Sequence, residues 1–146
     1  MKKTVVTLVT FFTIGLAISF ANNEPGVDPK IETAFKKEFS FATNVKWDTR
    51  GELTQVNFSL NDQGFVAWFN SDGELLSTAR NMLYMQLPLS VIKSLEQDYA
   101  NANISGIVEI SRNGETFYQI TAERKGKKFL LKANPSGYIA IIKRLK

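Results

Sequence analysis

The sequence predicts a single α+β protein made of two tandem units, each a helix followed by a meander of antiparallel strands. Three observations support this fold class. Apolar residues recur at helical spacing in two segments, other segments alternate apolar and polar residues between turns, and the same order of features returns about sixty residues later. A chain of 146 residues has the length of one domain, or of two very small units that share a sheet.

The N-terminal segment predicts export. Two lysines precede an apolar run at residues 5–18, and Ser-Phe-Ala at residues 19–21 places small residues where a signal peptidase cleaves. The pattern predicts a signal peptide over residues 1–21, because a membrane-spanning helix needs a longer apolar run of about 20 residues. We expect a periplasmic or secreted protein with a disordered leader at residues 22–27 and no stable membrane anchor after cleavage.

Charge and composition argue against a nucleic acid partner. Cleavage would leave sixteen basic residues against fourteen acidic ones, so the expected mature protein is only slightly basic. No basic cluster interleaved with aromatic residues is evident, as nucleic-acid binding would favour, and we expect no nucleic acid partner. The basic residues 143–146 are interpreted as a solvated end.

The first unit is predicted at residues 28–80. Asp28 and Pro29 are typical of a helix start, and Ile31, Phe35 and Phe39 follow at helical spacing. Short strands are then predicted at 45–47, 54–60, 65–69 and 74–79, with turns at 61–64 and 70–73 among them. Strands joined by so few residues must be antiparallel neighbours.

The second unit is predicted at residues 88–146, after a linker at 81–87 that could extend the preceding strand or form a turn of helix. Val91, Leu95 and Tyr99 stand sixty residues after Ile31, Phe35 and Phe39. The later strands and turns also match, with an offset that grows to about sixty-four residues. These matches indicate an internal duplication.

Three motifs carry a family resemblance. Residues 35–39 (FKKEF), 42–47 (ATNVKW) and 66–75 (VAWFNSDGEL) resemble the PepSY-like, beta-lactamase-inhibitor-like proteins exported by Bacteroidetes. The resemblance covers about residues 28–143 as two copies. The second copy departs from the pattern, because residues 107–110 replace the tryptophan strand and residues 128–132 replace the Trp-Phe pair.

The resemblance implies helices packed on one face of a curved antiparallel sheet, as in the beta-lactamase inhibitor protein (BLIP). Proteins of that architecture use the exposed concave sheet to hold a protein partner, and PepSY domains are proposed to inhibit or regulate peptidases. The resemblance brings no catalytic residues to carry over.

The residue types leave little room for catalysis. Histidine and cysteine are absent, which excludes Ser-His-Asp and Cys-His triads and the usual zinc and copper sites. The remaining candidates are carboxylates in or near turns, where aspartate is favoured because it hydrogen-bonds the local backbone: Asp48, Glu52, Asp62, Asp72 and Glu74. Neither a glycosidase pair nor a calcium loop is indicated. We expect no enzyme activity, catalytic residue, cofactor or metal.

Alternation in the second copy assigns the faces of the first. Lys128 and Lys132 must face water, so Phe129 and Leu131 should face the helices. The even offset between the copies then places Phe65, Ala67 and Phe69 in the core, and Val66 and Trp68 on the open face. Trp68 either anchors a partner or is covered by its own chain or a dimer mate. Trp47 is expected in the core.

The predicted function is a non-enzymatic exported protein-binding module that inhibits or regulates an unidentified envelope or secreted enzyme, such as a peptidase. The expected contact residues lie on the open face of the sheet: Gln55, Asn57, Val66, Trp68, Lys128, Leu130 and Lys132. One alternative is a periplasmic carrier of a small ligand or peptide, which requires a pocket between sheet and helices. Another is an envelope assembly or structural protein that adds strands at an exposed edge.

Overall fold

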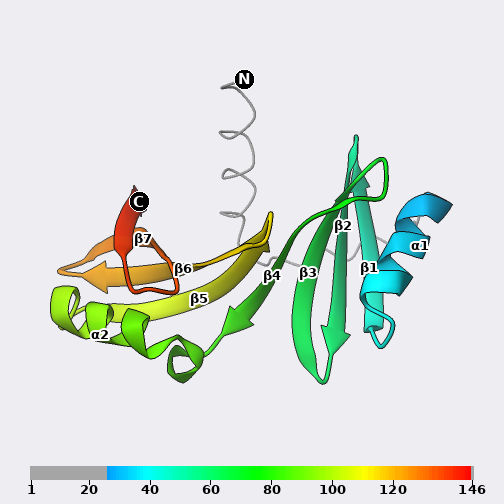
Figure 1. Cartoon of the computed structure of the whole chain (residues 1–146). Helices are drawn as coiled ribbons and strands as arrows, with labels where there is room; N and C mark the ends of the chain where they lie inside the picture. Colours follow the sequence, from blue (N-terminus) through cyan, green and yellow to red (C-terminus); the bar gives the residue numbers. More distant parts are fainter. Residues whose placement is uncertain (1–25, 146) are drawn as a thin grey trace.

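The computed structural model describes residues 26–145 as one antiparallel sheet of eight strands whose order in space equals their order in the chain (Figure 1). The expected signal peptide and most of the expected leader lie outside the described residues. The elements are α1 (Pro29–Glu38), β1 (Thr43–Arg50), β2 (Leu53–Leu60), β3 (Gln63–Asn70), β4 (Leu75–Met82), η2 (Tyr84–Gln86), α2 (Leu89–Asp98), β5 (Asn103–Arg112), β6 (Glu115–Arg124), β7 (Lys127–Ala133) and β8 (Ile139–Leu145). The predicted α+β fold class is confirmed.

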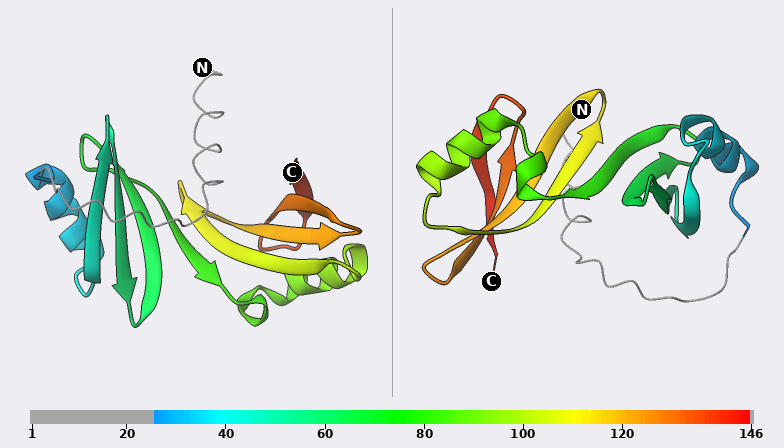
Figure 2. Two further views of the ribbon diagram at one scale, coloured as in Figure 1. Left: turned by 180° about the vertical axis from the view of Figure 1, so that it is seen from behind. Right: turned by 90° about the horizontal axis from the view of Figure 1, so that it is seen from below.

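The sheet is strongly bent, with β4 crossing from the first group of strands to the second (Figure 1). Both helices lie on the outer side of the bend, α1 against the first strands and α2 against β5 and its neighbours, and Figure 2 shows this from two further sides. The opposite side of the sheet is concave and is called the open face below. Among residues 26–145, neither helix has the length and apolar character needed to cross a membrane.

Each helix begins and packs as its sequence dictates. Asp28 accepts a hydrogen bond from the backbone N–H of Lys30 at 2.8 Å, and Pro29 occupies the first helical position of α1. The residues at helical spacing, Ile31 and Phe35 in α1, are buried against the sheet. Val91 and Leu95 of α2 do the same in the second unit, so each helix covers its own group of strands.

Two hydrophobic cores result, one under each helix. The first contains Ile31, Phe35, Val56, Phe58, Ala67 and Phe69. The second contains Leu87, Val91, Leu95, Ile107, Tyr118, Ile120, Ala122, Leu131 and Ala133. Trp47 packs against the first core as expected, with its ring 5.1 Å from that of Phe35 in an edge-on contact.

One local expectation needs correction, and the structure decides one that the sequence left open. The turn predicted at residues 61–64 is only two residues long, because Asn61 and Asp62 both adopt positive φ (48° and 62°), and β3 begins at the next residue. Asparagine and aspartate tolerate this backbone region, which a tight hairpin requires. Both alternatives for residues 81–87 occur in the structure. β4 continues to Met82, and the short 3-10 helix η2 follows at Tyr84–Gln86.

Matching turns dock each meander onto its helix. Asn70 and Asn134 hold equivalent turns, because each side-chain oxygen accepts hydrogen bonds of 2.9–3.1 Å from two backbone N–H groups that follow it. Gly73 and Gly137 then adopt positive φ (81° and 93°) and lie against the first turns of α1 and α2. Helix and sheet are therefore held together at the same place in both units.

Candidate protein-binding face

Four of the predicted contact residues lie together on the open face. Val56 and Phe58 of β2 belong to the first core, so the residues that alternate with them, Gln55 and Asn57, point the other way. Gln55 stands directly opposite Trp68, and Asn57 directly opposite Val66, across the β2–β3 pair. Gln55 donates a hydrogen bond of 3.3 Å to the side-chain oxygen of Asn57. These residues form a patch with one amide edge and one apolar edge.

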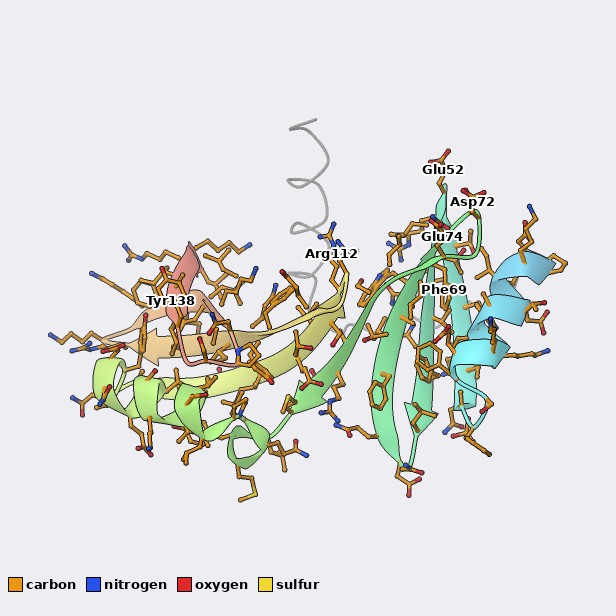
Figure 3. The ribbon with its side chains drawn as sticks, in the orientation of Figure 1. Glu52, Phe69, Asp72, Glu74, Arg112 and Tyr138 are labelled. Atoms are coloured by element: carbon orange, nitrogen blue, oxygen red, sulfur yellow. The ribbon has the colours of Figure 1, made fainter. Side chains whose placement is uncertain are left out.

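Trp68 is half-buried, so part of its indole lies against the chain and part is accessible. Its neighbour across the β3–β4 pair is Ser77, which in turn stands opposite Arg112 of β5. Ser77 is only 3% exposed, and its hydroxyl has no hydrogen-bond partner among the described residues. The small serine therefore lies in the row between two large open-face side chains, and Figure 3 shows Arg112 at the end of β5 near the first unit.

An apolar row, which the sequence analysis missed, continues the patch across the bend. Val66 stands opposite Ala79, Ala79 opposite Ile110, and Ile110 opposite Phe117. Ala79 and Ile110 are 5% and 2% exposed, whereas Val66 and Phe117 are half-buried. Alternation within β5 and β6 could have placed Ile110 and Phe117 on the open face. It could not show that they continue the row from Val66.

The candidates of the second unit differ from one another. The ammonium group of Lys132 lies 4.2 Å above the ring centre of Phe117, so Lys132 belongs to the end of the apolar row. Lys128 is exposed but lies next to Glu123, at 3.7 Å. Leu130 is only 7% exposed, and its neighbours across the strand pairs are Thr121 of β6 and Lys143 of β8. Leu130 therefore offers little surface to a partner.

A surface hollow of about 550 Å³ adjoins the end of the row at Phe117 and Lys132. Its lining combines aromatic, amide and charged groups: Glu115, Thr116, Phe117, Lys132, Asn134, Pro135, Tyr138 and Ala140. Tyr138 is 69% exposed and comes from the turn before β8 (Figure 3). A side chain of a bound partner could occupy this hollow while the partner covers the row.

Two of the carboxylates considered as catalytic candidates, Asp48 and Glu74, have partners close to them in the chain. Glu52, Asp72 and Glu74 lie at one end of the first unit (Figure 3). Glu74 accepts a hydrogen bond of 2.7 Å from the amide of Asn70, and Asp48 pairs with Arg50 at 2.7 Å. Within residues 26–145, no three acidic side chains gather closely enough to hold a metal ion.

Comparison with known proteins rests on solved structures, because no protein-family model and no curated protein matches the sequence. A BLIP-like protein from Bacteroides fragilis is 22% identical and matches with a TM-score of 0.73, covering 84% of this chain and 88% of that one. The protein has a BLIP-like fold. A DUF2874 family protein from Bacteroides ovatus is 21% identical (TM-score 0.71; 86% and 89% covered). A predicted periplasmic protein from Bacteroides eggerthii is 14% identical (TM-score 0.71; 82% and 88% covered). At these identities the comparison establishes the fold alone.

Proposed function

We propose that this chain is a non-enzymatic exported module that binds another protein through its open face. The observation that carries the proposal is the apolar row from Val66 through Ala79 and Ile110 to Phe117. This row crosses both units on the side of the sheet that neither helix covers (Figure 1). The middle of the row is buried, but its two ends, Val66 and Phe117, are half-buried and keep apolar surface that a partner could cover.

The composition around the row fits a protein interface. Trp68 and Phe117 provide aromatic rings, the residue type that most often dominates binding energy, and both keep accessible surface. Polar groups border them, with Gln55 and Asn57 at one side and Lys132 at the other. A partly apolar centre with a polar rim is the usual anatomy of a protein–protein interface.

The concave shape suggests how binding could regulate an enzyme. A bent sheet receives a convex part of its partner, and a module of this size seated over an active site would exclude the substrate by steric occlusion. The family resemblance and the BLIP-like fold support the proposal that the partner is an envelope or secreted enzyme, such as a peptidase. The predicted signal peptide and the periplasmic description of the Bacteroides eggerthii protein support export.

The carrier alternative is disfavoured by the packing between sheet and helices. Phe35 is 3% exposed, and Val56 and Val91 are fully buried, so side chains fill the space where a ligand would have to lie. The assembly alternative retains one observation in its favour. Among residues 26–145, β8 has a strand neighbour on one side only, and its Ile141 is 57% exposed.

The experiment begins with capture of partners by the immobilised mature protein from envelope and secreted fractions of its own organism, with identification by mass spectrometry. Binding of the purified candidate is then measured for the wild type and for Trp68→Ala. We expect Trp68→Ala to weaken binding by at least about tenfold while the melting temperature changes little. A captured enzyme should lose activity as wild-type protein is added.

Phe41→Ala is the matched control. Phe41 is an aromatic residue with 86% exposure in the turn between α1 and β1, outside the open face. Its replacement should leave both binding and melting temperature unchanged. Unimpaired binding by folded Trp68→Ala, or unfolding of that variant, would contradict the proposed anchor.

A further inference from the structure

The C-terminal part of the chain concentrates positive charge. Between residues 124 and 145 the sequence contains seven basic side chains and no acidic one. The sequence alone presents them as a hairpin turn and a separate tail. The antiparallel pairing of β7 with β8 brings the two together, because Lys128 stands opposite Leu145 and Leu130 opposite Lys143.

Six of these side chains form what we call the basic corner. All are exposed: Arg124, Lys125, Lys127, Lys128, Lys143 and Arg144. Lys125 and Gly126 form the tight turn between β6 and β7, with φ of 51° and 68°, so the cations on both strands stay close together. A surface hollow of about 480 Å³ lies among them, lined by Gly126, Lys127, Lys128, Arg144 and Leu145.

The chain supplies almost no counter-charge at this corner. Glu123 lies 3.7 Å from Lys128, and both side chains are about half exposed or less (38% and 53%), so this ion pair is weak. In the described part of the chain, the other five cations make no ion pair. Like charges held together in this way repel one another and create a positive potential that attracts anions.

The two halves of the molecule carry net charge of opposite sign. Residues 26–82 carry six basic and eight acidic side chains, whereas residues 83–145 carry nine basic and five acidic ones. The β6–β7 turn lies at the outer end of the second unit, on the side of the molecule opposite α1 (Figure 1). An anionic plane would therefore attract the corner and repel the first unit, which orients the molecule.

We propose that the basic corner docks reversibly on the anionic headgroups of a lipid bilayer. Four of the six cations are lysines, whose long, flexible side chains suit a mobile layer of phosphate groups better than a fixed pattern of partner carboxylates. The basic corner is separate from the patch formed by Gln55, Asn57, Val66 and Trp68, so the docked protein keeps that patch available. Attraction of this kind falls off within a Debye length and is weakened by salt.

The test is flotation of the chain starting at Asn22, which contains every helix and strand described above, with lipid vesicles. An equimolar mixture of phosphatidylcholine and phosphatidylglycerol is compared with pure phosphatidylcholine. We expect binding to the mixed vesicles only, weakened by added salt. The triple variant Lys125→Gln, Lys127→Gln, Arg144→Gln should bind roughly a hundredfold more weakly, at about fivefold per charge.

The control variant Lys30→Gln, Lys37→Gln, Lys93→Gln removes the same charge from exposed positions on the two helices and should bind as the wild type does. Trp68→Ala should also float normally, which separates this proposal from the proposed function. Equal loss in both triple variants, loss in Trp68→Ala, or no preference for the mixed vesicles would overturn the proposal. Wild type that ignores vesicles but captures an acidic protein through the corner would overturn it too.

Discussion

Arg80 and Glu109 join the two units on the helix side of the sheet. The Nε atom of Arg80 donates a hydrogen bond of 2.7 Å to Oε1 of Glu109, across the β4–β5 pair. The guanidinium carbon lies 5.8 Å from the ring centre of Phe65, which packs on the first core, and Glu109 stands opposite Tyr118 of the second core. This polar link therefore lies between the two hydrophobic cores.

Replacement of Glu109 by alanine should lower the free energy of unfolding by about 2 kcal/mol, measured by urea denaturation. The side chains of Arg80 and Glu109 are only 31% and 21% exposed, so the lost partner leaves a partly desolvated guanidinium. A double-mutant cycle with Arg80→Ala isolates the interaction. The pair Glu32–Lys36 on α1, 46% and 71% exposed, is the control, and Lys36→Gln should cost about 0.5 kcal/mol or less. Equal costs at both pairs would contradict this account of the link.

Gly137→Ala should destabilise the protein by about 2 kcal/mol or more. A Cβ atom at Gly137 would lie 2.6 Å from the carbonyl oxygen of Ser90 in the first turn of α2, so the turn and the helix would have to separate. Gly114→Ala is the matched control, because Gly114 also has positive φ (76°) but nothing lies within 4 Å of an added Cβ. That variant should lose only the backbone term of about 1 kcal/mol. The docking argument fails if thermal unfolding ranks the two variants equally.

Stability should fall as the pH rises above about 10. Burial of the Tyr118 side chain, with a smaller effect of the Glu109 carboxylate, raises the pKa of Tyr118, although Arg80 opposes the shift. A raised folded-state pKa means that the fold favours the neutral phenol. The stability that the neutral Tyr118 phenol contributes is fully present below the pKa of tyrosine in the unfolded chain. It is lost as the pH rises through the pKa of Tyr118 in the folded protein.

The check is a series of urea titrations between neutral and strongly alkaline pH. Tyr118→Phe should show a shallower loss of stability at high pH. The loss should not disappear, because burial also raises the pKa of Tyr84 and Tyr99. An unchanged slope in Tyr118→Phe would show that Tyr118 does not contribute.

Sequence patterns predicted α1, α2 and the strands of the first unit, but not the full length of those strands. Residues 143–145, interpreted from the sequence as part of a solvated end, instead belong to β8 and pair with β7. The strand predicted at residues 45–47 extends over Thr43–Arg50 as β1. Its polar ends pair with β2 through backbone hydrogen bonds, which leave no alternation of apolar and polar residues to detect. Leu130 shows the converse limit. Alternation indicates the face on which a residue lies, but the side chains packed around that residue decide whether it is accessible, since Leu130 is buried whereas Lys128 and Lys132 on the same face of β7 are exposed.

Local physical chemistry accounts for what can be predicted from residues near one another in the chain: the N-cap of α1, the apolar spacing of α1 and α2, the tight turns and the core face of each strand. Pairing between β4 and β5 decides the rest. It places Ala79 against Ile110 and Arg80 against Glu109, residues about thirty positions apart with a helix between them. The β7–β8 pair likewise completes the basic corner. Side chains so distant become neighbours only through the register of the bent sheet, because burial of both cores determines that register.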